Sequence, residues 1–109
     1  MRITIENEQF DKAEIILDGT YSEEKISLQT YEKGSYAAVI YTDNGTQKQV
    51  VRLYAVEGES LREVLSYECS VWSGGVRAYM QNGRFYVVSF METAAFDAES
   101  GTQVGFIEY

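Results

Sequence analysis

The sequence predicts an all-β domain in which an antiparallel meander forms a small sandwich or barrel. Two Asn-Gly pairs, Asn44-Gly45 and Asn82-Gly83, each separate stretches of alternating apolar and polar residues, the pattern of β-hairpins closed by type I′ turns. The chain has no proline, so every backbone N–H is available to a neighbouring strand. Strands recurring about every eight to twelve residues favour a sandwich or small barrel. A chain of this length is expected to form one domain, residues 1–109.

The N-terminal third is expected to contribute three strands. Residues 2–6 and 13–18 alternate over short stretches that a polar connection separates. Residues 25–31 alternate as well, which places Leu28 on the inward face and Tyr31 on the outward face. These strands lead into the next hairpin through a turn rich in polar residues and glycine.

The stretch 36–54 is expected to be the central hairpin of the domain. A two-residue loop at Asn44-Gly45 would pair Thr42 with Gln47 and, further along, Val39 with Val50. Alternation then places one set of side chains on a common face: Ala37, Val39, Tyr41, Lys48, Val50, Arg52 and Tyr54. Both faces are apolar near the open end, so the hairpin is expected to be covered on both sides there.

Residues 57–72 fit two structures. A capping-box pattern at 60–63, followed by apolar residues at helical spacing, indicates a short helix. Alternation instead places a set of apolar residues on one strand face: Leu61, Leu65, Tyr67, Cys69 and Val71. The β-branched and aromatic residues favour a strand over about 64–72, with room for one short helical turn near 60–66.

Asn82-Gly83 is expected to close a second hairpin, in which Tyr79 pairs with Tyr86. Its core face is predicted to contain Val76, Ala78, Met80, Phe85 and Val87. Its semi-polar face is predicted to contain Arg77, Tyr79, Gln81, Arg84, Tyr86 and Val88. The chain is then expected to turn at Gly101, which can adopt the left-handed conformation, and to end in a strand over 103–109.

The charge balance limits the partners that the protein can bind. Seventeen acidic residues against nine basic ones give a net charge of −8, and no basic residue follows Arg84. Such a surface repels nucleic acids and anionic lipid, so direct binding to either is not expected, whereas a basic protein surface would be attracted. The N-terminus lacks the apolar run of a signal peptide, and Cys69 is the only cysteine, so the sequence predicts a cytoplasmic protein.

The sequence predicts no catalytic, metal or cofactor site, and therefore no enzyme. It contains no histidine, the commonest general base and a member of most zinc sites. It also contains no P-loop and no dinucleotide-binding fingerprint. Cys69 lies in an alternating apolar stretch and is expected to be a small buried hydrophobic residue.

These features favour a non-enzymatic inhibitor that occupies a basic surface of a partner protein, such as a nucleic-acid-binding groove. Carboxylates would stand in for phosphates, and tyrosines would supply rigid contact area. The candidate contact residues are Glu6, Glu8, Asp11, Glu14 and Asp18 at the N-terminal edge, or Tyr79 and Tyr86 on the second hairpin. In general character the chain is similar to anti-defence proteins of phages, including anti-CRISPR proteins, and to bacterial toxin-immunity proteins.

Two other functions fit the composition. One is a small-ligand-binding β-barrel with a cavity lined by aromatic residues, namely Tyr36, Tyr54, Trp72, Tyr79, Tyr86 and Phe90. The other is a structural or assembly subunit that forms a homo-oligomer through its strand edges. The sequence alone does not choose among the three.

Overall fold

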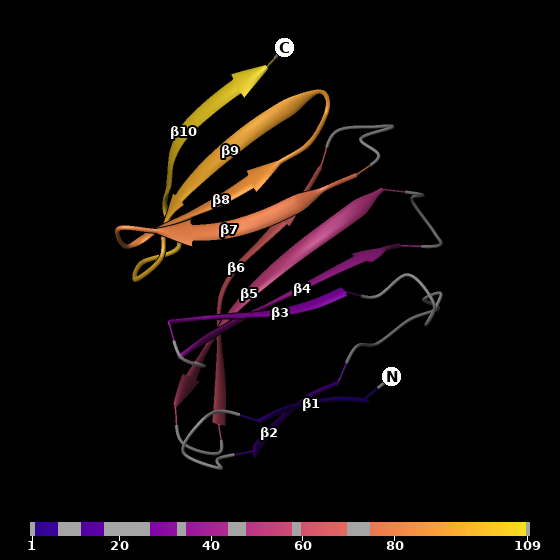
Figure 1. Ribbon diagram of the computed structural model, residues 1–109, viewed down its shortest axis with the longest axis vertical. Helices are drawn as coiled ribbons and strands as arrows, with labels where there is room; N and C mark the ends of the chain where they lie inside the picture. Colours follow the sequence, from indigo (N-terminus) through magenta and orange to yellow (C-terminus); the bar gives the residue numbers. More distant parts are fainter. Residues whose placement is uncertain are drawn as a thin grey trace.

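The computed structural model describes residues 2–6, 12–16, 27–32, 35–43, 48–57, 60–69 and 75–108. These residues form strands and turns, with no α-helix among them (Figure 1). The strands of the described part are β1 (Arg2–Glu6), β2 (Lys12–Ile16), β3 (Ser27–Tyr31), β4 (Tyr36–Thr42), β5 (Gln49–Glu57), β6 (Ser60–Glu68), β7 (Arg77–Gln81), β8 (Arg84–Val88), β9 (Glu92–Asp97) and β10 (Gln103–Glu108). In this part of the chain no helix could cross a membrane.

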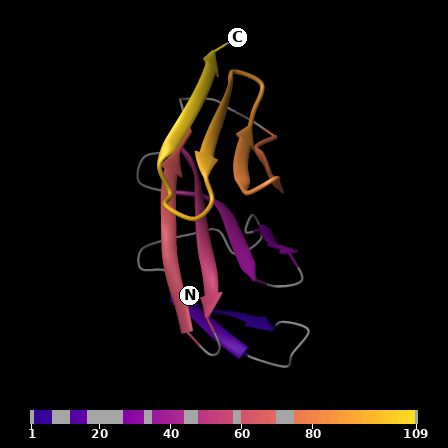
Figure 2. The same ribbon diagram turned by 90° about the vertical axis from the view of Figure 1, so that its left-hand side faces the viewer.

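The strands pair in three antiparallel sheets. The first sheet has the order β3-β4-β5-β6, and the second sheet has the order β10-β9-β8-β7, so each is a four-stranded meander. β1 and β2 form a separate N-terminal hairpin at the far end of the molecule, where β2 comes close to β6 (Figures 1 and 2). The predicted all-β antiparallel class is therefore confirmed, in its sandwich form.

The main core lies between the first and second sheets. The first sheet and the residue just after it contribute Ala38, Ile40, Val51, Leu53, Leu65 and Cys69. The second sheet and the turn after β9 contribute Ala78, Phe85, Val87, Ala94, Phe96 and Ala98. Cys69 is fully buried, as predicted, and behaves as a small hydrophobic residue.

Two aromatic contacts show how the sheets overlap. Tyr31 of β3 packs edge-on against Phe85 of β8, with ring centroids 5.9 Å apart, and its hydroxyl donates to the carbonyl oxygen of Ala78 at 2.8 Å. Tyr67 of β6 packs edge-on against Phe96 of β9 at 5.3 Å. Since β3 faces β8 and β6 faces β9, the outermost strand β10 lies at the margin of the overlap.

The first sheet is also covered on its other face. A second buried cluster there contains Ala37, Val39, Tyr41, Val50 and Tyr54, with Val56 and Leu61 packed against it. Val39 on this face and Val51 on the face toward the second sheet are both fully buried. The prediction that the central hairpin is covered on both sides near its open end is therefore confirmed.

The Asn82-Gly83 turn is formed as predicted. Asn82 has φ of 53° and Gly83 has φ of 75°, the positive values that a type I′ turn requires. Tyr79 pairs with Tyr86 and Gln81 with Arg84. The faces also follow the prediction: Ala78, Phe85 and Val87 are buried, while the opposite side of the hairpin is exposed or half-buried.

The central hairpin pairs two residues out of the predicted register. Thr42 pairs with Gln49 and Val39 with Arg52, and the N–H of Asp43 donates to the carbonyl oxygen of Lys48 at 2.9 Å. The predicted Asn44-Gly45 turn itself lies outside the described residues, but the pairs that flank it are two residues out of the register that a two-residue loop would give. A shift of two residues leaves every side chain on its predicted face, so the apolar pattern could not distinguish the two registers.

β6 corrects two predictions. Residues 60–66 contain no helical turn, because the strand begins at Ser60 and pairs with Glu57. A β-bulge then leaves Val64 without a partner: Leu53 pairs with Leu65, whereas Tyr54 pairs with Glu63. The extra residue reverses the alternation, so Leu61 packs in the second cluster while Leu65 and Tyr67 pack in the main core. The prediction of one shared face is therefore confirmed for Leu65, Tyr67 and Cys69 and wrong for Leu61, while Val71 lies outside the described residues.

The inward and outward faces of β3 are also reversed relative to the prediction. Tyr31, expected to face outward, packs in the main core, and its neighbour Thr30 is exposed. The first sheet is apolar on both faces near β4, so alternation along β3 did not indicate which face meets the second sheet. The position of Tyr31 is set by its partner Phe85 across the core.

Candidate functional site

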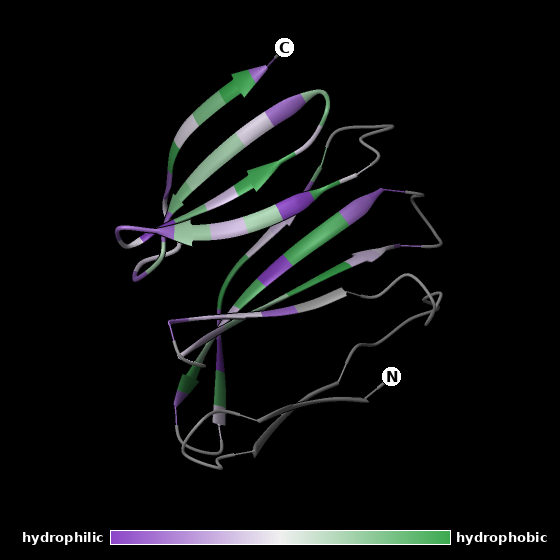
Figure 3. Ribbon diagram, viewed as in Figure 1, coloured by the Kyte–Doolittle hydropathy of each residue, from purple (hydrophilic) through white to green (hydrophobic). Residues whose placement is uncertain are grey.

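Exposed apolar side chains are concentrated on the second sheet. In the described part of the chain, the large apolar residues that remain exposed are Tyr79 (45%), Phe90 (79%), Met91 (47%), Val104 (47%), Phe106 (48%) and Ile107 (60%). All of them belong to β7, β10 or the β8–β9 turn, and none belongs to the first sheet. Figure 3 shows the corresponding contrast: the hydrophobic stretches of β4 and β5 lie inside the molecule, whereas that of β10 lies at its margin. Clustered apolar exposure of this kind marks interaction surfaces.

A stacked tyrosine pair lies on the outer face of the second sheet, which we define as the face turned away from the main core. Tyr79 of β7 and Tyr86 of β8 are directly paired, with ring centroids 5.1 Å apart and ring planes 22° from parallel. Their neighbours Ala78 and Phe85 point into the core, so both tyrosines point outward. The row continues across the sheet with Ala95, which has only a methyl group, and Gly105, which has no side chain, so no large side chain stands beside the rings in this row.

The charges on this sheet are divided between its two halves. Arg77 and Arg84 lie on β7 and β8, whereas residues 85–108 contain acidic residues and no basic ones. Arg84 pairs with Asp97 in the strand register. The backbone N–H groups of Ser100 and Glu99 donate to the Asp97 carboxylate at 2.9 Å, and these hydrogen bonds lower the pKa of Asp97. The turn carboxylate therefore stays ionised at neutral pH.

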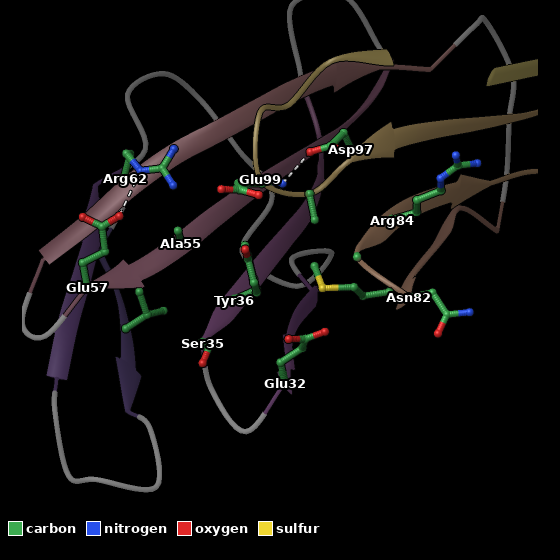
Figure 4. Close-up of a pocket in the computed structure, with 14 residues that line it drawn as sticks. Glu32, Ser35, Tyr36, Ala55, Glu57, Arg62, Asn82, Arg84, Asp97 and Glu99 are labelled. Carbon is green, nitrogen blue, oxygen red and sulfur yellow. Dashed lines mark hydrogen bonds and ion pairs between the residues drawn. The ribbon is translucent and has the colours of Figure 1, made fainter. Parts of the chain in front are cut away.

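A cleft of about 600 Å³ opens at the end of the sandwich where the hairpin turns of both sheets meet (Figure 4). Tyr36, Ala55, Glu57 and Arg62 line it from the first sheet, and Arg84, Asp97 and Glu99 line it from the second sheet and its turns. Arg62 forms an ion pair with Glu57 at 2.9 Å, drawn as a dashed line. The described residues include no group of three or more that could hold a metal ion.

The N-terminal candidates are only partly placed. Glu6 pairs with Lys12 and Glu14 with Thr4 in the N-terminal hairpin, so Glu6 and Glu14 occupy register positions on the same face, next to a basic residue. Glu8, Asp11 and Asp18 lie outside the described residues. The structure thus brings Tyr79 and Tyr86 together, while the five acidic residues are not shown to form one patch.

The aromatic residues expected to line a ligand cavity do not converge. Tyr36 reaches the end cleft, Tyr54 is buried in the second cluster, and Tyr79 and Tyr86 lie on the outer face. Phe90 lies exposed in the β8–β9 turn, and Trp72 is outside the described residues. That predicted cavity is therefore wrong for the five residues that are described.

The apolar character of β10 was not predicted from the sequence. The strand 103–109 was expected only to close the fold, and the structure shows Val104, Phe106 and Ile107 exposed by 47%, 48% and 60%. A signal was present in the adjacent pair Phe106-Ile107, because two consecutive apolar residues in a strand must point to opposite faces.

Comparisons with known proteins give no family model, no curated protein and no solved structure that matches this chain. The function is therefore inferred from the surface of the second sheet: the stacked tyrosines, the exposed apolar residues of β10 and the neighbouring carboxylates.

Proposed function

We propose that this chain is a non-enzymatic, acidic protein-binding inhibitor that acts in the cytoplasm by occupying a basic surface of a partner protein. The observation that carries the proposal is the stacked Tyr79–Tyr86 pair on the outer face of the second sheet, in which Tyr79 is exposed and Tyr86 is partly buried. Tyrosine is enriched among residues that dominate binding energy, because it offers a large contact area and a polar tip with few rotatable bonds.

The charge of the chain supports a basic partner. The net charge of −8 would accelerate the approach of a positively charged protein and disfavour nucleic acid as a direct ligand. Asp97 ends β9, Glu99 lies in the β9–β10 turn and Glu108 ends β10, so they belong to the same sheet as the exposed apolar residues, where they could face cationic groups that otherwise bind phosphates. This combination is expected of an inhibitor of anti-CRISPR, other anti-defence or toxin-immunity type.

The sheet also provides a rigid support for the contact surface. Tyr79 and Tyr86 sit on strands joined by a type I′ turn, and the reverse side of those strands packs in the main core through Ala78, Phe85 and Val87. Side chains held in this way lose little conformational entropy on binding, so more of the contact energy contributes to affinity.

The experiment that tests the proposal is capture of a partner from bacterial lysate on immobilised protein, at low and at high salt, with identification by mass spectrometry. We expect one basic protein to be captured at low salt and to be released in part at high salt, because screening weakens the attraction of exposed charges. Capture of acidic proteins only, or of nucleic acid in place of protein, would contradict the proposal.

Variants then locate the contact. Tyr79→Ser/Tyr86→Ser should weaken binding of the captured protein about thirtyfold, as expected for the loss of central aromatic contacts. Arg62→Ser removes a long exposed side chain from the first sheet and should change affinity less than about twofold. Glu6→Lys/Glu14→Lys tests the N-terminal edge directly. If this pair weakens binding more than the tyrosine pair does, the assignment to the second sheet is wrong.

A further inference from the structure

The second sheet ends in an open edge at β10. β10 pairs with β9 on one side, and no strand of the described part pairs with its other side. The register shift between Gln103 and Gly105 is confined to the start of the strand, so residues 105–108 pair regularly with β9. Within the described part of the chain, the outer backbone N–H and C=O groups of this stretch therefore face no neighbouring strand, the condition under which a further strand can add.

β10 has only part of the protection that is usual for an edge strand. Edge strands are commonly protected by charged residues, especially lysine, by proline or by β-bulges. β10 has the register shift at its start, but no charged residue and no proline from Gln103 to Ile107. On β6, at the edge of the first sheet, Arg62, Glu63 and Glu68 each form an ion pair with β5 or with residues next to it. From Gln103 to Ile107, β10 has no charged residue at all, and Glu108 stands at its end.

Both faces of this edge are apolar and exposed. Phe106 pairs with Ala94 on the core side, and Ile107 pairs with Thr93 on the outer side. Their exposed fractions are 48% and 60%. An added strand would therefore find an apolar neighbour for its side chains on each face, in addition to the backbone hydrogen bonds that give strand addition its affinity.

The charges around β10 indicate which strand would fit. Asp97, Glu99 and Glu108 lie on β9, β10 and the turn between them, and no basic residue occurs from 85 to 108. A second copy of the chain would bring the same carboxylates and another net charge of −8 to this edge, which opposes pairing. A segment rich in lysine or arginine would instead be attracted.

We infer that β10 binds an extended, basic segment of the partner protein as a fifth strand of the second sheet. The inference rests on the proposed function in that it assigns the segment to the inhibited partner. The binding mode itself depends only on the open edge, the exposed Phe106 and Ile107, and the neighbouring carboxylates.

The inference can be tested without knowing the partner. The probe is a synthetic peptide of alternating valine and lysine, with a peptide of alternating valine and glutamate as control. Amide hydrogen exchange of the full chain is followed by NMR. The basic peptide should slow exchange about tenfold at alternate residues of β10, because an added antiparallel strand bonds every second backbone group. The acidic peptide should leave these rates unchanged.

A matched pair of variants sharpens the test. Ile107→Lys places a positive charge at the edge and should abolish the slowing, whereas Ser66→Lys, an exposed position on the edge strand β6, should retain it. Three results would overturn the inference. The basic peptide could leave amide exchange at β10 unchanged, it could slow exchange only at Tyr79 and Tyr86, or exchange at β10 could slow without any peptide when the protein concentration is raised. The third result would identify a second copy as the occupant.

The two proposals can fail separately. If the basic peptide protects β10 while the lysate experiment captures only acidic proteins, or nucleic acid in place of protein, the edge inference stands and the inhibitor is contradicted. If a captured partner binds Ile107→Lys as tightly as the unmodified chain, the edge inference fails and the inhibitor remains.

Discussion

The first and second sheets have the same topology but differ in how many of their faces are buried. Each is an antiparallel meander of four strands, but the first is buried on both faces around β4 and β5, while the second is buried on one face only. Val39 and Val51 show the difference on the first sheet, since they lie on opposite faces and are both fully buried. Similar strand connections therefore support two roles: a scaffold in the first sheet and an exposed surface in the second.

The charges follow the same division. In the first sheet Lys48, Arg52 and Arg62 each form an ion pair with a glutamate, at distances of 3.1, 3.7 and 2.9 Å. In the second sheet no ion pair between described residues involves Asp97, Glu99 or Glu108. Asp97 lies opposite Arg84 in the strand register, which offsets part of its charge, but carboxylates without an ion pair to a described residue can still act on an approaching partner, as the proposed function requires.

The largest expected loss of stability is at Gly101, in the segment between β9 and β10, which lies against β6 of the first sheet. Gly101 has φ of 77°, and a Cβ atom there would overlap the backbone carbonyl of Val64 at the β6 bulge. Gly101→Ala should lower the free energy of unfolding by about 3 kcal/mol or more, through backbone strain and this clash together. Chemical denaturation measures the effect.

Gly83→Ala is the matched control for this contact. Gly83 has nearly the same φ, 75°, but nothing lies within 4 Å of an added Cβ. This variant should therefore lose only about 1 kcal/mol, the strain alone. Equal losses at Gly101 and Gly83 would show that the turn of the second sheet does not press against the first.

Three valine truncations test the difference in burial itself. Val39→Ala and Val51→Ala should each lower the free energy of unfolding by about 2 kcal/mol, because each leaves a cavity in a closed core. Val104→Ala on β10, where the side chain is 47% exposed, should cost less than about 0.5 kcal/mol. A small effect at Val39 would contradict the covered outer face of the first sheet.

A smaller effect than at the buried valines is expected at Tyr31, which links β3 to the second sheet. Tyr31→Phe removes the hydrogen bonds of the hydroxyl to Ala78 and Gln29 and should cost about 1 kcal/mol. Tyr79→Phe, on the exposed face, should change stability by less than about 0.5 kcal/mol. Thermal unfolding of the two variants gives the comparison.

Tyr31 and Tyr67 also make the stability of the fold depend on pH in the alkaline range. Burial raises the pKa of Tyr31 from 10.0 to about 12, and burial together with the nearby Glu92 carboxylate raises the pKa of Tyr67 to about 12. Because the folded pKa lies above the unfolded one, this contribution to stability is fully present below pH 10.0 and is lost as the pH rises through about 12. Tyr31→Phe should reduce the alkaline loss in this window, and an unchanged alkaline profile would contradict the burial of its hydroxyl.

Local chemistry explains which parts of the fold were predictable. Asn82-Gly83 gave the correct turn and register, because both residues accept positive φ and the flanking strands have one buried face. The central hairpin kept its faces but not its register, since a shift by two residues preserves alternation. The Val64 bulge could not be predicted, because one inserted residue reverses the pattern without a glycine or proline to mark it.

The candidate site was predictable only where it depends on a single hairpin. The pairing of Tyr79 with Tyr86 followed from the turn alone, and the structure places the two rings together on the outer face. The exposure of Phe106 and Ile107 depends on how far the two sheets overlap and on which strand is outermost. No local pattern contains that information.

The most direct test of the division between the two sheets is hydroxyl-radical footprinting of the free protein, with the oxidised positions read by mass spectrometry. Tyr79, Phe106 and Ile107 of the second sheet should be modified rapidly. Tyr41 and Tyr54, which are 2% and 8% exposed on the outer face of the first sheet, should be protected until the protein unfolds. Modification of Tyr41 and Tyr54 at the rate of Tyr79 would contradict the account, because the first sheet would then present an open surface as well.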